Sequence, residues 1–300
     1  MKLRLGIIGF GEVGAIFARG LRDQEGVASV HAWDIKFADT AAGAAAARAA
    51  ADADRIRSVG GMAALCAEAD LLISAVTASS TLAAAEEAAR HARHGSLFLD
   101  LNSASPGTKQ RAAQLLQAAG VDYVEAGVMT SVPPYGIRVP MLLGGARAAE
   151  LSGRLKAWGM DATPVSQQLG VASAIKMSRS IMIKGLEALV IEAYATARHY
   201  GVEEHMLPTL KETFPQIDWD RQGAYFFSRV VQHGKRRAEE MREAAQTVQE
   251  AGFPPFMAAA TAEKQDWIAH MARDGVFEGL DSKSPWQDYA DRVIAATRAK

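Results

Sequence analysis

The chain has 300 residues, of which 49% are hydrophobic and 22% are charged, with 33 Lys and Arg against 34 Asp and Glu. A net charge of −1 gives no field to hold nucleic acid or an anionic membrane, and a single cysteine, Cys66, excludes a disulfide framework and a cysteine-rich zinc site. We therefore expect about two globular domains in a reducing compartment, the cytoplasm, with no membrane span and no metal site.

In the first half of the chain, short apolar runs alternate with amphipathic stretches, which is typical of a parallel sheet covered by helices. Strands are predicted at Leu3–Ile8, Ser29–Asp34, Arg55–Val59, Leu71–Val76, Ser96–Leu101, Tyr123–Ala126 and Val139–Leu143. Helices are predicted between them at Val13–Arg22, Ala41–Ala53, Met62–Ala67, Ser80–Arg93 and Lys109–Ala118.

From Gln168 onward, helical spacing dominates, over Ser173–Tyr200, Ser228–Ala251 and Ala258–Arg273. The expected fold class is therefore α/β. An N-terminal Rossmann domain with a doubly wound sheet would occupy residues 1–164, and an all-α C-terminal domain would occupy residues 165–300.

A glycine-rich turn, Gly9-Phe10-Gly11-Glu12-Val13-Gly14, joins the first predicted strand to the first predicted helix. In this G-x-G-x-x-G context the first glycine permits a tight turn, the second lets the backbone approach a pyrophosphate, and the third allows close packing of helix on strand. The competing interpretation is an ordinary glycine-rich turn. We predict that these six residues bind a dinucleotide.

The choice between NAD and NADP depends on the end of the second predicted strand. Asp34 can accept hydrogen bonds from the adenosine ribose and repel a 2′-phosphate, whereas Lys36 can turn toward such a phosphate. We therefore predict NAD as the cofactor, with NADP as the alternative; Asp34 can also be a solvated strand-end acid. Val76 and Thr77, at the end of the fourth predicted strand, are also predicted to bind the cofactor.

Three further segments carry a resemblance to a known family. They are Asp100-Leu101-Asn102-Ser103-Ala104-Ser105-Pro106, Glu125-Ala126-Gly127-Val128-Met129-Thr130 and Gly170-Val171-Ala172-Ser173-Ala174-Ile175-Lys176. Together with the glycine-rich turn, they resemble the β-hydroxyacid dehydrogenase family, which includes 3-hydroxyisobutyrate dehydrogenase and 6-phosphogluconate dehydrogenase relatives. The resemblance covers nearly the whole chain and favours the phosphogluconate-dehydrogenase-like subgroup with its own helical C-terminal domain.

The resemblance implies roles for several residues. Lys176 corresponds to the family's catalytic lysine, although Ala172 stands where the family has a second glycine, and Asn102 and Ser103 would lie beside the nicotinamide. Glu240 matches, weakly, an acidic residue of the C-terminal domain.

The substrate-binding segments depart from the family pattern. Met129 replaces a substrate-binding serine, so Thr130 or Ser131 would supply the hydroxyl contact. Ser180 replaces an asparagine, and the preceding Arg179 is either a carboxylate clamp or a helix-surface residue.

The chemistry supports a role for Lys176 independently. Oxidation of a secondary alcohol needs a group that takes the hydroxyl proton, and a lysine can do so when burial and a nearby positive charge lower its pKa. Lys176 lies in a mostly apolar stretch at a helix start, where the ordinary interpretation is a surface lysine. Lys184, eight residues later, shares the helix face and is the competing candidate.

The densest charge cluster, His233–Met241, is interpreted as a solvated helix face, with contact to an anionic substrate group as the alternative. The predicted function is hydride transfer between NAD(P) and a small β-hydroxyacid or related hydroxy compound, held between the domains. An NADPH-dependent imine or keto-acid reductase and a non-catalytic NAD(P)-binding regulator are the rivals. The resemblance also implies a homodimer or homotetramer.

Overall fold

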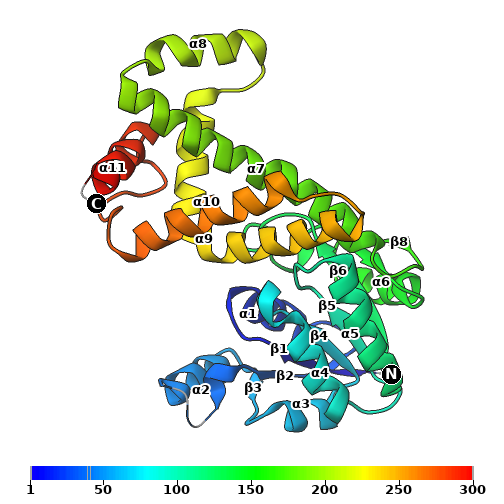
Figure 1. Cartoon of the computed structure of the whole chain (residues 1–300). Coiled ribbons are helices and arrows are strands. Elements are labelled where there is room, and N and C mark those ends of the chain that lie inside the picture. The colour runs from blue at the N-terminus through cyan, green and yellow to red at the C-terminus, as the bar shows by residue number, and fades with distance from the viewer. Residues whose placement is uncertain (1, 39, 41, 299–300) are drawn as a thin grey trace. The chain divides into compact units, whose positions relative to one another are not determined.

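The computed structural model describes residues 2–38, 40 and 42–298 (Figure 1). They form two compact units, Met1–Met177 and Ser178–Lys300, which divide inside the long helix α7, Val171–Tyr200. The border predicted between residues 164 and 165 falls within the last strand of the sheet, β8, Ala162–Ser166. Ala41, which the prediction placed in a helix, lies outside the described residues.

The first unit contains an eight-stranded sheet in the order β3-β2-β1-β4-β5-β6-β7-β8. All neighbouring strands are parallel except β6 and β7, which are antiparallel. The first six strands have the order 3-2-1-4-5-6, which is that of a Rossmann fold. The predicted α/β class with a doubly wound sheet is confirmed.

The strand bounds are β1 Leu3–Ile8, β2 Val27–Trp33, β3 Arg57–Ser58, β4 Leu71–Ser74, β5 Leu97–Asp100, β6 Asp122–Val128, β7 Met141–Gly144 and β8 Ala162–Ser166. The helices of this unit, besides the start of α7, are α1 Glu12–Leu21, α2 Ala44–Ala53, α3 Met62–Glu68, α4 Thr81–His91, α5 Pro106–Ala118 and α6 Ala148–Ala157, with 3-10 turns η1 Ile35–Phe37, η2 Ala78–Ser80 and η3 Gly136–Arg138. In this unit, α6, β8 and the 3-10 turns η1 and η3 have no counterpart among the predicted elements. β8 carries Pro164 and exposed side chains, so it lacks the apolar run that marks the inner strands.

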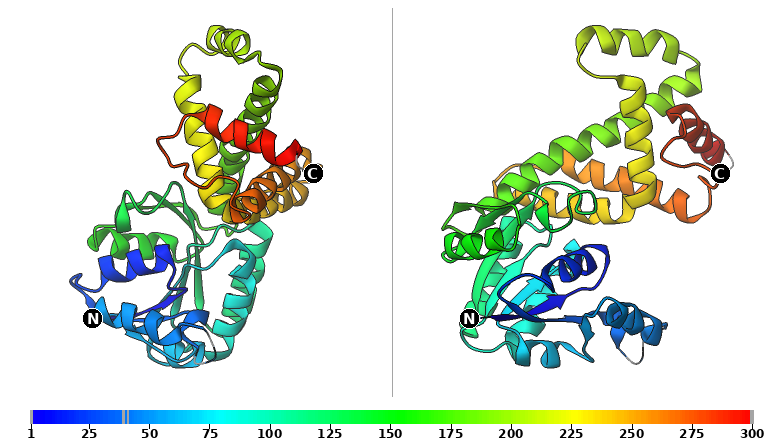
Figure 2. Two further views of the ribbon diagram at one scale, coloured as in Figure 1. Left: turned by 90° about the vertical axis from the view of Figure 1, so that its left-hand side faces the viewer. Right: turned by 180° about the vertical axis from the view of Figure 1, so that it is seen from behind.

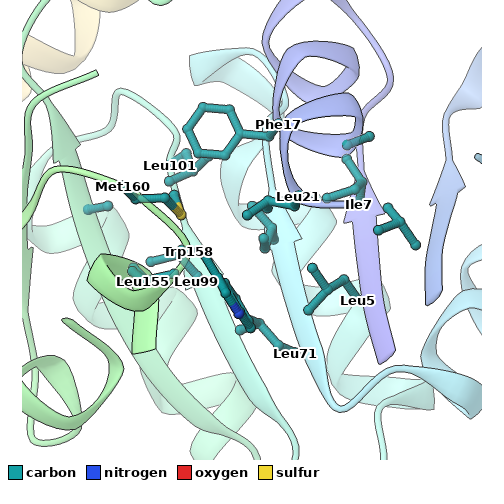
Figure 3. Packing of buried hydrophobic residues seen from close by; sticks show 14 of the residues in the cluster. Leu5, Ile7, Phe17, Leu21, Leu71, Leu99, Leu101, Leu155, Trp158 and Met160 are labelled. Atoms are coloured by element: carbon teal, nitrogen blue, oxygen red, sulfur yellow. The ribbon is translucent and has the colours of Figure 1, made fainter. Parts of the chain in front are cut away.

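Two apolar clusters cover the two faces of the sheet, because successive side chains of a strand point to opposite faces. On one face, Phe17 of α1 and Leu155 of α6 pack with Leu71 and Leu99 of the central strands (Figure 3). On the other face, Leu72, next to Leu71, packs with side chains of α3, α4 and α5. Both clusters hold the carboxyl ends of β1, β4 and β5 in fixed positions.

The second unit is all-α in its described residues, as predicted, with helices joined by turns and loops and no strand. Two of its helices, over 203–213 and 286–298, were not predicted. After α7 it consists of α8 Glu203–Thr213, α9 Trp219–Glu250, α10 Phe256–Arg273 and α11 Trp286–Arg298. Helices α9 and α10 lie side by side (Figure 2), and aromatic side chains of α7, α9 and α11 form the core of the unit. None of the described helices is long and apolar enough to cross a membrane.

Candidate functional site

The candidate site lies at the carboxyl ends of the central strands. The strand order reverses between β1 and β4, and open α/β sheets bind ligands at this point. Gly9 donates its N–H to the Trp33 carbonyl over 2.8 Å, and Ala75 donates to the Ile8 carbonyl over 2.8 Å. These bonds tie the chain segments after β1, β2 and β4 together.

The three glycines of the turn have three different environments. Gly9 has φ +88°, and a Cβ there would lie 2.7 Å from the Ala75 carbonyl oxygen. A Cβ on Gly14 would lie 1.9 Å from the Gly9 carbonyl oxygen, so helix and turn can approach only without a side chain. Gly11, the N-cap of α1, has no heavy atom within 4 Å of an added Cβ. The open space faces a helix N-terminus, where backbone N–H groups favour an anion, so the turn fits a pyrophosphate.

Asp34 is bonded to the same turn. One of its carboxylate oxygens accepts from the Phe10 N–H over 2.7 Å and the other accepts from the Lys36 N–H over 2.9 Å. Each carboxylate oxygen has a second acceptor position, which leaves capacity for ribose hydroxyls. The Lys36 side chain is exposed, and Ile35, which lies between Asp34 and Lys36 in the sequence, is 79% exposed. The arrangement is compatible with a dinucleotide whose ribose lies against Asp34.

Asn102 connects the ends of β4 and β5. Its side-chain oxygen accepts from the Val76 N–H over 2.8 Å, and its side-chain nitrogen donates to the Ser74 hydroxyl over 2.9 Å. Thr77, which follows Val76, lies 3.2 and 3.1 Å from the Ser79 and Ser80 hydroxyls. Because Asn102 is buried, it holds the two segments together from within.

Ser103 and Lys176 are in direct contact. The Lys176 ammonium nitrogen donates to the Ser103 hydroxyl oxygen over 2.6 Å. Ser103 follows β5 and Lys176 lies in the second turn of α7, and both side chains are half-buried. A Cβ on Gly127 would lie 2.9 Å from the Ala172 carbonyl oxygen, so this glycine allows β6 to approach the helix. Two residues 73 positions apart in the sequence thus form one polar pair.

A buried ion pair supports the segment that carries Ser103. The Lys109 ammonium lies 2.8 Å from the Asp100 carboxylate, and both side chains are inaccessible to solvent. The Tyr123 hydroxyl donates to the other Asp100 oxygen over 2.6 Å, and burial, with the adjacent Asp100 charge, raises the pKa of Tyr123 well above its usual value. Neither Lys109 nor Tyr123 was predicted as a member of this support, because nothing in the sequence pattern marks a lysine in a helix as buried.

The predicted substrate-binding residues fall in both units. In the first unit Met129 donates its N–H to the Pro140 carbonyl over 2.9 Å, Thr130 is exposed and Ser131 is half-buried. In the second unit, Arg179 is exposed, whereas Ser180 is buried and accepts from Lys184 over 3.3 Å.

The charged run of α9 differs from the predicted solvated face. Glu240 is paired with the competing lysine Lys184 over 2.8 Å. Arg237 is buried and bonded to Glu187, with one N–O distance of 2.9 Å. The run therefore faces both solvent and the helix interface, because a helix turns successive residues to different sides.

Metal and thiol chemistry find no support in the part of the chain that the structure describes. No group of three His, Cys, Asp or Glu side chains there could hold a metal ion. Burial, together with the negative charge of Glu87, raises the pKa of the Cys66 thiol to about 12, so the thiol stays protonated at neutral pH.

Comparison with known proteins gives two domain matches. Residues 4–149 match the NAD binding domain of 6-phosphogluconate dehydrogenase, and residues 197–268 match a domain of unknown function, DUF1932. A conserved hypothetical protein from Sinorhizobium meliloti 1021 is 38% identical over 98% of this chain and 97% of its own, with a TM-score of 0.76. The conserved protein MTH1747, described as structurally similar to 3-hydroxyacid dehydrogenases, is 30% identical over 90% of this chain and 98% of its own, with a TM-score of 0.68.

More distant solved structures share the fold. A 3-hydroxyisobutyrate dehydrogenase from Mycobacterium tuberculosis is 16% identical over 99% of both chains, with a TM-score of 0.70. A reductive aminase from Aspergillus terreus, in complex with NADPH and ethyl levulinate, is 19% identical over 98% of this chain and 99% of its own, with a TM-score of 0.56. At these identities the likeness extends to the architecture alone.

Proposed function

The chain belongs to the β-hydroxyacid dehydrogenase family and is an NAD(P)-dependent oxidoreductase, and on that premise we propose that it acts on the hydroxyl carbon of a β-hydroxyacid or related hydroxy compound. The observation that carries the proposal is the 2.6 Å contact between the Lys176 amine and the Ser103 hydroxyl. The contact places a proton-transfer group of α7 against the segment that follows β5.

In the proposed mechanism, Lys176 acts as the general acid/base. The glycine-rich turn and Asp34 would hold NAD(P), whose nicotinamide would supply hydride transfer. In the direction of oxidation, the neutral Lys176 amine takes the proton of the substrate hydroxyl, and in reduction the ammonium returns it to the carbonyl oxygen. The Ser103 hydroxyl fixes the position of the amine, and Asn102 holds the segment on which Ser103 lies. Met129, Thr130, Ser131, Arg179, Ser180 and Glu240 remain predicted substrate-binding residues.

For the cofactor, we propose that NAD is preferred over NADP. The support is the Asp34 carboxylate, which is held beside the glycine-rich turn by the Phe10 and Lys36 N–H groups and would repel a 2′-phosphate. The exposed Lys36 side chain weakens this discrimination, so NADP stays the alternative.

A screen of hydroxy acids, including aryl-substituted ones, with NAD and NADP side by side tests the proposal. Turnover is measured as absorbance of the reduced cofactor, and we expect oxidation of at least one β-hydroxyacid, with NAD the better cofactor. Turnover of imines or keto acids with NADPH alone would favour the reductase alternative. Cofactor binding without any turnover would favour the regulatory alternative.

We further propose a homodimer or homotetramer located in the cytoplasm. The helical unit exposes large apolar side chains, among them Met182 at 72%, Phe256 at 76% and Leu189 at 53%. Large exposed apolar side chains are enriched on surfaces that associate, which supports the proposal. Light scattering coupled to size exclusion would measure the mass, and a single 32.0 kDa species would contradict the proposed assembly.

A further inference from the structure

Glu125 on β6 is a buried carboxylate bonded to the beginning of α7. One of its oxygens accepts from the N–H groups of Gly170 over 2.7 Å and Ala172 over 3.1 Å, and the other accepts from the Ser173 hydroxyl. The first N–H groups of a helix have no partner within the helix, and they carry a partial positive charge. These bonds offset the cost of burying Glu125, whose side chain is inaccessible to solvent.

The space around this carboxylate is closed. A Cβ on Gly144, its neighbour on β7, would lie 2.5 Å from the Glu125 Oε1 atom. On the other side Gly170 has φ +99°, and a Cβ there would lie 3.0 Å from the Gln110 amide nitrogen and 3.1 Å from the Pro106 Cβ. The Glu125 side chain therefore bridges β6 and the first turn of α7, beside a glycine that leaves room for its Oε1 atom.

Glu125 and Asp100 are register partners on the neighbouring parallel strands β6 and β5. Asp100 accepts from the Asn102 N–H over 2.9 Å and binds Lys109, so it holds the segment that carries Ser103. Glu125 holds the helix that carries Lys176. Lys176 and Ser103 are thus anchored by two buried carboxylates on adjacent strands, Lys176 by Glu125 and Ser103 by Asp100.

We propose that Glu125 is a positioning residue for Lys176, and that the length of its side chain, through the first turn of α7, sets the contact between Lys176 and Ser103. The positioning role concerns the geometry of this pair, and its consequence for catalysis rests on the proposed function. Glutamine has the same length and its side-chain oxygen can accept the two backbone N–H bonds, whereas aspartate keeps the charge but is one methylene shorter.

Crystal structures and kinetics of Glu125→Asp and Glu125→Gln test the proposal. In Glu125→Asp, the distance between the Lys176 amine and the Ser103 hydroxyl should exceed hydrogen-bond range, and kcat should fall by on the order of 10- to 100-fold, while the Kd for NADH stays within about twofold. In Glu125→Gln the contact should persist and kcat should stay within about threefold of wild type.

A second variant perturbs the same carboxylate from the other side. Gly144→Ala would place its methyl group 2.5 Å from Oε1, so it should also separate Lys176 from Ser103. Gly153→Ala is the matched control, because Gly153, in α6, has no atom within 4 Å of an added Cβ. Its kcat should equal that of the wild type.

The structural and kinetic readouts separate two kinds of failure. If the Lys176–Ser103 contact persists in Glu125→Asp and Gly144→Ala, or if Glu125→Gln separates it as Glu125→Asp does, the positioning role is refuted whatever the activity. If the shorter side chain separates the pair but the wild type oxidises no hydroxy compound, the positioning role stands and the proposed reaction fails.

Discussion

The substitution Gly11→Ala tests the pyrophosphate site without disturbing the fold. Gly11 is the N-cap of α1, with φ −77° and no heavy atom within 4 Å of an added Cβ, so alanine fits both the backbone and the space. The methyl group would occupy the space through which a phosphate oxygen reaches the helix N–H groups. We expect Gly11→Ala to fold normally and to bind NADH weakly.

The expected loss follows from the bonds at stake. Displacement of the anion from one backbone N–H removes a charged hydrogen bond worth about 1.5–3 kcal/mol, which corresponds to about a 10- to 150-fold increase in the Kd for NADH. Loss of a glycine N-cap lowers the free energy of unfolding by about 1 kcal/mol or less. Fluorescence titration with NADH gives the Kd, and urea denaturation gives the stability.

Two other glycines provide the controls. Gly61, the N-cap of α3, is also extended, with no atom within 4 Å of an added Cβ, so Gly61→Ala should cost the same capping energy and leave NADH binding unchanged. In Gly14→Ala the methyl would lie 1.9 Å from the Gly9 carbonyl oxygen, which should lower the free energy of unfolding by about 3 kcal/mol. Wild-type NADH affinity in Gly11→Ala would refute the pyrophosphate site.

Three further predictions concern charges. Asp34→Asn should reduce the preference for NAD over NADP by about tenfold in kcat/KM, and an unchanged ratio would remove Asp34 from the selectivity. Lys109→Met should lower the free energy of unfolding in urea by about 3–5 kcal/mol because it leaves the buried Asp100 charge unpaired, and a loss below about 1 kcal/mol would contradict this. A hydrogen bond from Arg4 lowers the pKa of Asp70 to about 2. The ionised Asp70 carboxylate therefore stabilises the fold fully above about pH 4, and this stabilisation is lost as the pH falls toward 2. After allowance for solvent screening, Asp70→Asn should lower the free energy of unfolding at pH 7 by about 1 kcal/mol. The variant should also lose the part of the acid dependence of Tm that Asp70 causes, and an acid dependence equal to that of the wild type would refute this role of Asp70.

The sequence predicted the first unit well because its elements carry strong local signals. Apolar runs such as that of β1 and the glycine-rich turn before α1 require only a few neighbouring residues to be interpreted. β8 was missed because its side chains are mostly exposed and Pro164 interrupts the strand pattern, and α6 was missed although it directly precedes that strand. Burial alone did not decide which elements could be predicted, because α6 was missed although its Leu151 and Leu155 are buried.

The candidate site was predictable only as separate pieces. Lys176 and Ser103 were identified from different segments, but their contact depends on the anchoring of α7 by Glu125, which has no local signature. Likewise, Lys109 looks like an ordinary helix lysine until the fold places it against Asp100. Contacts of this kind arise from strand register and helix approach, which a single sequence does not encode locally.

The assignment of Lys176 as the general acid/base is tested most directly by Lys176→Met, compared with Lys184→Met. With a hydroxy substrate and NAD, Lys176→Met should lower kcat by on the order of 10²- to 10⁴-fold and leave the Kd for NADH within about twofold of wild type. Lys184→Met should lower kcat much less than Lys176→Met does, because the Lys184 ammonium is paired with Glu240 and is not the proposed proton-transfer group. Wild-type kcat in Lys176→Met would contradict the assignment.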